Sequence, residues 1–169
     1  MNDRIFIHKV IWINYTTYDV RLAQDSLNPR THADIMVLSN EDENCDEPHP
    51  YWYARIIGIY HVDVIHNLRG GTRSLAGEPV RIDLLWVRWF GRHLDHRAGW
   101  AARRLHRVGF VELDEETPAF GFLHPSQVVR GAHLIPAFHH GRTADLLPPS
   151  IARPESNNDE DWRFYYVNW

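Results

Sequence analysis

The sequence predicts a single, mainly β domain, organised as a distorted barrel or sandwich with one or two short helices. Three observations support this class. The apolar segments are short and rich in β-branched and aromatic residues, clusters of glycine and proline separate them, and only one segment has helical periodicity. The chain of 169 residues is long enough for one hydrophobic core and has no dividing linker, so one domain is expected over residues 1–169.

The predicted strands begin in the N-terminal quarter. Residues 5–13 and 32–39 are mainly apolar runs that favour strands, and the acidic residues 41–49 are expected to form a mobile loop. A long strand is predicted over residues 51–66, with a bend or bulge at Gly58. Residues 67–79 contain three glycines and are expected to form the hairpin connection that follows this strand.

The returning strand of that hairpin is predicted over residues 81–90. Alternation along it places one set of side chains toward the core and the other set away from the core. The set expected in the core is Ile82, Leu84, Trp86 and Phe90, and the opposite set is Arg81, Asp83, Leu85, Val87 and Trp89.

The C-terminal half contains the one helical segment, WAARRLHRV at residues 100–108. Its apolar residues recur at i, i+4 and i+7, which leaves its arginines largely outward. A single helical turn is expected at residues 125–129, a mobile polar loop at 148–161 and a closing aromatic strand at 161–169. Because the strand pattern still runs at the last residue, we expect the sequence to be truncated at its C-terminus.

Composition and motifs argue against an enzyme. The net charge of −4 does not by itself indicate a nucleic-acid or membrane partner. The single cysteine, Cys45, lies among carboxylates that disfavour a thiolate, so neither a disulfide framework nor a cysteine nucleophile is expected. The sequence has no GxSxG, P-loop, GxGxxG or HExxH motif, so no catalytic residue and no cofactor are predicted. Without a signal peptide or membrane span, we expect an intracellular protein.

Histidines leave a metal-dependent hydrolase open as the second alternative function. His93 and His96 are spaced H-x-x-H, with Asp95 between them. A catalytic zinc site needs three converging protein ligands, and these two histidines lie in what is predicted to be a loop. We therefore assign no metal ligand from the sequence.

Two tryptophans define the main predicted site. Trp52 and Trp89 lie on opposite strands of the long hairpin, where pairing brings side chains from both strands into contact. Two such walls can hold a methylated ammonium group by cation–π attraction, although tryptophans on strands are more often core. The predicted partner-binding residues are Trp52, Trp89, Phe90, Arg88 and Arg92.

An arginine-rich stretch offers the first alternative function, nucleic-acid binding. Residues 88–107 hold six arginines, one acid and two interleaved tryptophans, a pattern that suits phosphate contacts. The residues assigned to such a site are Arg97, Arg103, Arg104 and Arg107. The arginines of this stretch could instead pair with the acids of residues 41–47 or 159–161.

The order of the motifs over residues 32–169 resembles the bromo-adjacent homology (BAH) domain of chromatin proteins. The matches are Ala54-Arg55-Ile56 after Trp52, Val87-Arg88-Trp89-Phe90 with Arg92, Val129-Arg130-Gly131 before His133-Leu134-Ile135, and Arg163-Phe164-Tyr165-Tyr166. The resemblance implies a BAH-like fold, a nuclear protein-binding role and a histone tail as one partner to test. In methyl-lysine-reading members an aromatic cage binds the ligand; Trp52 and Trp89 match two of its walls, and the third wall falls on Gly91.

The wording of several segments is also similar to a group of uncharacterised fungal proteins that accompany transposons of the Kyakuja-Dileera-Zisupton (KDZ) type. YARIIGIYHVDV, LLWVRWFG and DWRFYYVNW carry this similarity. In that group the chain continues past the YYVN strand, which agrees with the expected truncation. The similarity implies a transposon-associated setting and assigns no activity to any residue.

Overall fold

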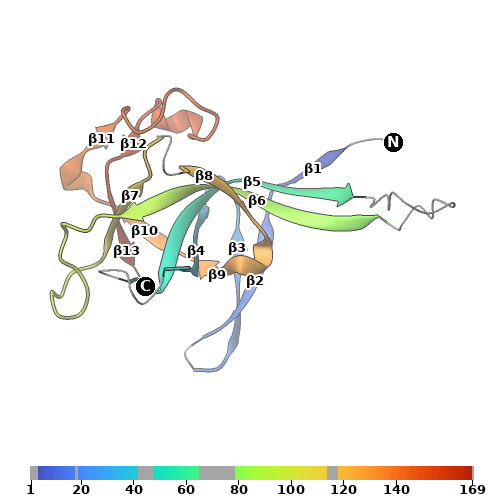
Figure 1. Cartoon of the computed structure of the whole chain (residues 1–169), viewed down its shortest axis with the longest axis horizontal. Helices are drawn as coiled ribbons and strands as arrows, with labels where there is room; N and C mark the ends of the chain where they lie inside the picture. Colours follow the sequence, from blue (N-terminus) through green and yellow to red (C-terminus); the bar gives the residue numbers. More distant parts are fainter. Residues whose placement is uncertain (1–3, 18, 42–47, 65–78, 114–117, 169) are drawn as a thin grey trace.

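The computed structural model describes residues 4–17, 19–41, 48–64, 79–113 and 118–168, and these residues fold into antiparallel β-sheets (Figure 1). The predicted mainly β class is confirmed. The helices among the described residues are three 3-10 turns, η1 Pro125–Gln127, η2 Phe138–His140 and η3 Glu155–Asn157. The first of them lies where the sequence predicts a helical turn. No described helix is long and apolar enough to cross a membrane.

Two strands are long, β5 Tyr51–Val64 and β6 Val80–Arg92, and the others are short. The short strands are β1 Ile5–His8, β2 Ile11–Thr16, β3 Leu22–Leu27, β4 Asp34–Leu38, β7 Arg107–Phe110, β8 Phe120–Leu123, β9 Val128–Gly131, β10 His133–Pro136, β11 Arg142–Thr143, β12 Asp161–Trp162 and β13 Tyr165–Asn168. The single strand predicted over residues 5–13 is therefore two strands. The polar strand β3 is absent from the sequence prediction because its residues lack β-branched side chains.

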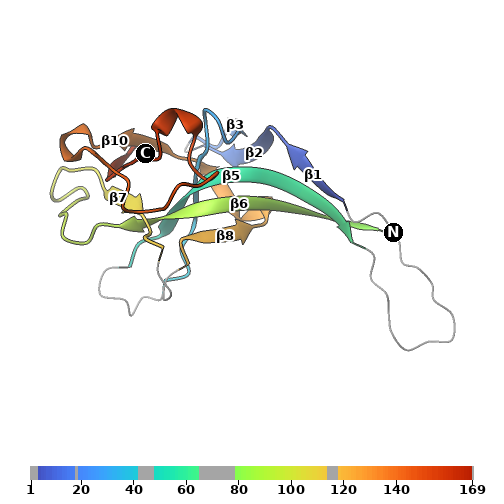
Figure 2. The same cartoon turned by 90° about the horizontal axis from the view of Figure 1, so that it is seen from above.

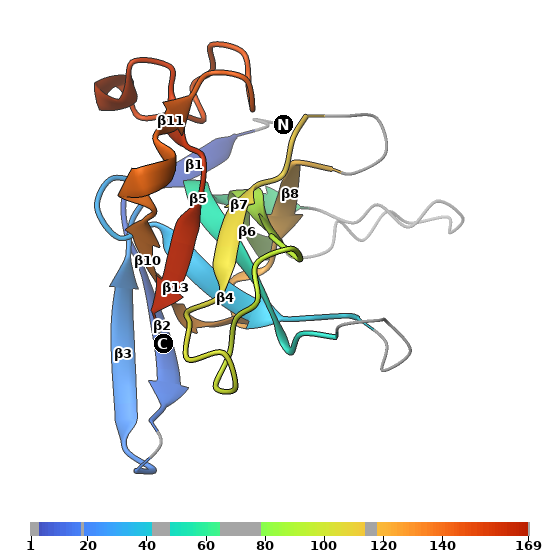
Figure 3. The ribbon, with the colours of Figure 1, turned by 90° about the vertical axis from the view of Figure 1, so that its left-hand side faces the viewer.

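The main sheet has the order β10-β13-β7-β6-β5-β4-β9, with β1 attached to β5 and β8 attached to β6. It is not a closed barrel, which corrects the barrel alternative of the prediction. Strands β9 and β10 nevertheless lie at opposite ends of this order and are separated in the chain by Ala132 alone, whose N–H donates to the Asp34 carbonyl at 2.8 Å. A separate hairpin of β2 and β3 contacts β9 (Figure 1), and Figure 3 shows this hairpin projecting away from the main sheet.

The long hairpin of β5 and β6 is the scaffold of the site, and Figure 2 shows the two strands curving side by side. Its register shifts between Ile56 and Gly58, so the bulge predicted at Gly58 is confirmed. A Cβ at Gly58 would overlap the ring of Tyr60, so a larger residue at this bend would require that ring to move. The predicted connection at residues 67–79 lies, apart from Pro79, outside the described residues.

The face assignment on β6 is wrong for most of the strand. Leu85 and Val87, expected away from the core, are 0% exposed and belong to one buried cluster with residues of β4, β5 and β9. Phe90, expected in the core, is buried in a second cluster with residues of β7 and β13. Ile82, Leu84 and Trp86 are only partly buried. Both faces of β6 are covered, and alternation cannot select a core face on such a strand.

The helix predicted over residues 100–108 does not form. Residues 100–103 make a turn that is closed by backbone hydrogen bonds between Gly99 and Arg104, and β7 begins at Arg107. Arg103 takes a positive φ of 50°, which a helix does not allow. A helix of nine residues depends on docking for its stability, and this segment pairs as a hairpin instead.

Candidate functional site

Trp52 on β5 and Trp89 on β6 converge on a common cavity of about 280 Å³. Their rings pack edge to face, with centroids 6.1 Å apart and an angle of 80° between the planes. Both side chains are partly buried against the first core cluster. We call this cavity the tryptophan pocket. Its other lining residues are Glu41, Tyr51, Tyr53, Phe90, Gly91, Arg92, Val111 and Pro118.

A carboxylate lies beside the two tryptophans. Glu41 Oε1 accepts a hydrogen bond from Trp52 Nε1 at 3.1 Å, and Glu41 Oε2 accepts from the backbone N–H of His49 at 2.9 Å and from Arg92 at 3.3 Å. Burial alone would raise the pKa of Glu41, but these hydrogen bonds and the charge of Arg92 lower it below its ordinary value. Glu41 is therefore ionised at neutral pH and holds the Trp52 ring in place.

The pocket is open on the side of Gly91, where the resemblance to BAH domains places a third aromatic wall. Among the described residues, a Cβ on Gly91 would meet only Val111 Cγ2, at an ordinary contact distance of 3.6 Å. The pocket therefore has two indole walls, and space remains for a third side chain. Sequence reasoning missed Glu41 and Val111, because each comes from a segment outside the hairpin.

Arg88 does not belong to an exposed partner-binding surface, in contrast to the prediction. It is 1% exposed, its Nη1 donates to Asp161 Oδ2 at 2.9 Å, and its guanidinium carbon lies 3.8 Å from the centre of the Phe110 ring. Burial lowers its pKa, while the neighbouring carboxylate opposes that shift. Phe90 is also buried, and it stacks on Phe110 while it contributes to the inner wall of the tryptophan pocket.

Two arginines of the 88–107 stretch thus pair with acids of the same chain, as the alternative interpretation allowed. Arg88 pairs with Asp161, and Arg92 pairs with Glu41. Of the predicted acidic segments, residues 42–47 lie outside the described part of the chain. Arg92 also lines a second cavity, so it stands between the tryptophan pocket and the loop that follows β6.

We call residues 93–106, between β6 and β7, the arginine loop. Arg97, Arg103 and Arg104 are exposed on it, and none of them forms an ion pair with any residue that the structure describes. Trp100 lies at the tip and is 99% exposed. The predicted nucleic-acid-binding arginines of the loop are therefore available to a ligand.

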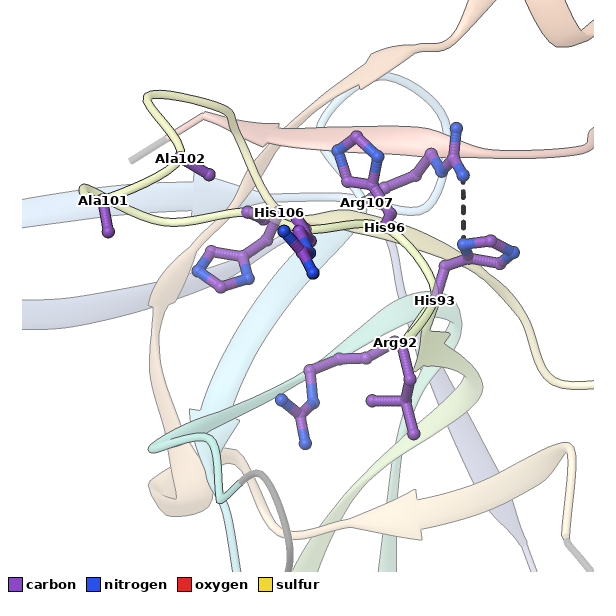
Figure 4. A pocket seen from close by; sticks show the side chains of 10 residues that line it. Arg92, His93, His96, Ala101, Ala102, His106 and Arg107 are labelled. Carbon is purple, nitrogen blue, oxygen red and sulfur yellow. Dashed lines mark hydrogen bonds between the residues drawn. The ribbon is translucent and has the colours of Figure 1, made fainter.

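Beside this loop lies a cleft of about 520 Å³ (Figure 4). It is lined by Arg92, Arg97, Arg107, His93, His96 and His106, together with alanines and Leu94, and none of its described lining residues is an acid. We call it the histidine cleft. Figure 4 shows these side chains coming from the end of β6, the loop and the start of β7.

Arg107 is engaged inside the protein, unlike the other three predicted nucleic-acid contacts. Its Nη2 donates to His93 Nδ1 at 3.0 Å and its Nη1 donates to His140 Nε2 at 2.8 Å. Arginine has only donors, so His93 Nδ1 and His140 Nε2 are the acceptors of these two hydrogen bonds. The guanidinium carbon also lies 4.7 Å from the centre of the Phe164 ring. Arg107 therefore organises the wall of the cleft.

The H-x-x-H pair is not arranged as a metal site. His93 accepts from Arg107, and His96 Nε2 donates to the Leu105 carbonyl at 3.2 Å. Within the described ranges, no three histidine, cysteine or acidic side chains lie together as metal ligands. Burial first, then nearby Arg107, lowers the pKa of His96. The geometry gives no support to the metal-dependent hydrolase.

No protein-family model, curated protein or solved structure significantly matches the sequence or the fold.

Proposed function

We propose that this protein is a non-enzymatic interaction module that binds a protein or peptide partner at the tryptophan pocket. The observation that carries the proposal is the convergence of Trp52 and Trp89 on a partly open cavity with an ionised carboxylate beside it. Aromatic side chains in such pockets are the usual anchors of protein interfaces. The volume of about 280 Å³ lies just below the roughly 300–1,000 Å³ of small-molecule sites, which favours a single side chain as the occupant.

The occupant proposed first is a lysine side chain of a basic tail. Indole rings attract an ammonium group by cation–π interaction, and Glu41, which also pairs with Arg92 at 3.3 Å, places a carboxylate in the same cavity. The resemblance to BAH domains supports a histone tail as the partner and a nuclear, chromatin-associated or transposon-associated setting. Because Gly91 leaves one wall open, we expect weak, millimolar binding of an isolated methylated ammonium.

The test is a titration of the ¹⁵N-labelled protein followed by NMR. The ligands are tetramethylammonium and a histone H3 tail peptide, unmodified or trimethylated on lysine. We expect the indole N–H signals of Trp52 and Trp89 to shift, and Trp89→Ala to remove the response. Trp12→Ala is the matched control, because Trp12 is exposed on β2 outside the pocket. Absence of a response to all ligands at millimolar concentration would overturn the proposal.

A second variant protects the test against a folding defect, because Trp89 also packs on the core. Glu41→Gln keeps a hydrogen-bond acceptor for Trp52 Nε1 and removes the charge. We expect it to weaken tetramethylammonium binding severalfold and to leave the near-ultraviolet circular dichroism unchanged. Unchanged affinity in a folded Glu41→Gln variant would contradict the contribution that the proposal assigns to the Glu41 charge.

A further inference from the structure

The tip of the arginine loop exposes an aromatic ring that contributes nothing to folding. Trp100 is 99% exposed, so it buries almost no apolar surface. The backbone that carries it is fixed by hydrogen bonds from Gly99 N–H to the Arg104 carbonyl at 2.8 Å and from Arg103 N–H to the Trp100 carbonyl at 3.2 Å. A large aromatic side chain held at a defined turn and left in water is available for stacking by a ligand.

Positive charge surrounds this ring. Arg103 and Arg104 follow Trp100 along the tip and line, with Leu105, His106 and Asn168, a groove of about 840 Å³. His106 also lines the histidine cleft, so the groove and the cleft are neighbours that share this residue in their walls. The one acid of the loop, Asp95, is exposed and forms no ion pair within the described ranges.

The groove and the cleft are therefore two adjacent surfaces whose described lining residues include arginines and no carboxylate. Arg97, Arg103 and Arg104 have no acidic partner among the described residues, and Arg107 is held in the cleft wall by hydrogen bonds to His93 and His140. The whole chain has a net charge of −4, so this local concentration of arginine is not a consequence of a basic composition. Such a patch selects ligands that carry several phosphates.

We propose that the arginine loop binds single-stranded nucleic acid, with a base stacked on Trp100 and the backbone phosphates placed on Arg103, Arg104 and Arg97. An exposed indole beside arginines is the arrangement that single-stranded sites use, because every unpaired base presents a face for stacking. Base faces inside a duplex are covered by their neighbours, and the loop forms no helix that could enter a major groove. The proposal does not depend on the tryptophan pocket.

The experiment measures binding of fluorescein-labelled oligo(dT) of 20 nucleotides by fluorescence anisotropy over a range of salt concentrations. We expect Trp100→Ala to weaken binding about tenfold, in line with the loss of one stacked base. The double variant Arg103→Ala/Arg104→Ala should reduce the slope of the logarithm of the binding constant against the logarithm of the salt concentration by about 1.4. This corresponds to about 0.7 for each of the two phosphate contacts that are lost. Trp12→Ala and Arg30→Ala are the matched controls, because both residues are exposed outside the loop.

Two comparison ligands separate stacking from simple charge attraction. Inorganic polyphosphate has the charge and no bases, and the (dA)·(dT) duplex has bases that are already stacked. The proposal is supported if oligo(dT) binds more tightly than both and only its affinity depends on Trp100. The proposal would be overturned if polyphosphate bound as tightly as oligo(dT) or if the duplex bound more tightly. It would also be overturned if Trp100→Ala left the affinity for oligo(dT) unchanged, or if oligo(dT) did not bind at low salt.

Discussion

Replacing Asp161 with asparagine should destabilise the fold severely, although the change removes only one charge. Asp161 is 2% exposed, and its Oδ2 accepts hydrogen bonds from Arg88 Nη1 and from Arg153 Nε, each at 2.9 Å. Both arginines are buried, so the carboxylate is the counter-charge that their burial requires. Arg88 Nε and Nη2 already have no hydrogen-bond partner among the described residues, which leaves this arginine little alternative to Asp161.

The expected loss follows from the number of cations left without a counter-charge. Removing one member of a buried ion pair costs about 3–5 kcal/mol of unfolding free energy, and here one carboxylate serves two arginines. Domains of this kind are stable by about 5–15 kcal/mol, so the variant should lose a large share of its stability. At this chain length, 3–5 kcal/mol corresponds to a fall in Tm of about 6–20 °C.

Urea unfolding followed by tryptophan fluorescence measures the effect. The midpoint should fall while the m value stays constant, because the surface exposed on unfolding is the same. Asp159→Asn is the matched control, since Asp159 is exposed two residues away, and it should change stability by less than about 0.5 kcal/mol. A loss below about 1 kcal/mol for Asp161→Asn would refute the argument that the two buried arginines depend on this carboxylate.

Two further predictions concern the tryptophan pocket and the histidines. Gly91→Tyr should tighten tetramethylammonium binding about fivefold, because a side chain fits beside Val111 and would add the third aromatic wall. Gly91→Ala is the control in the same NMR titration and should leave the affinity unchanged. Equal affinities of the two variants would contradict the interpretation that the pocket lacks one wall at Gly91. Burial lowers the pKa of His106 in the folded protein, and the charges of His49, Arg92 and His96 lower it further. Below the ordinary histidine pKa of about 6.5, His106 is therefore more protonated in the unfolded chain than in the folded protein. The contribution of neutral His106 to the unfolding free energy should therefore be complete above about pH 6.5 and should be lost as the pH drops toward the lower folded pKa. His106→Gln should reduce the difference in unfolding free energy between pH 7.5 and pH 5.5, as measured by urea titration. An unchanged difference between the two pH values would contradict this prediction.

Local sequence was sufficient for much of the strand framework. The β-branched and aromatic runs at residues 34–38 and 51–64 form β4 and β5, and Gly58 marks the bulge, because side-chain shape and glycine act over a few residues. The same hairpin pairing placed Trp52 and Trp89 near each other, as expected from residues on neighbouring strands.

Segments whose structure depends on distant partners were predicted less well. Residues 100–108 have helical spacing, yet they form a turn and the start of β7, which pairs with β6 and β13. The polar segment at 148–161 contains the buried Arg153, whose role is visible only once Asp161 is seen beside Arg88 from β6. A short apolar period does not reveal which hydrogen-bond partners the rest of the chain provides.

The sequence by itself determined the mainly β class, the long hairpin and the proximity of its two tryptophans, because these follow from residue shape and short-range spacing. Only the tertiary structure decided which charged and aromatic side chains face water. Arg88 is buried and donates a hydrogen bond to Asp161, which lies 73 residues away in the chain, while Trp100 stays exposed at a turn. Alternation assigns a side chain to a face of a strand, but burial depends on what packs against that face, and distant segments supply it.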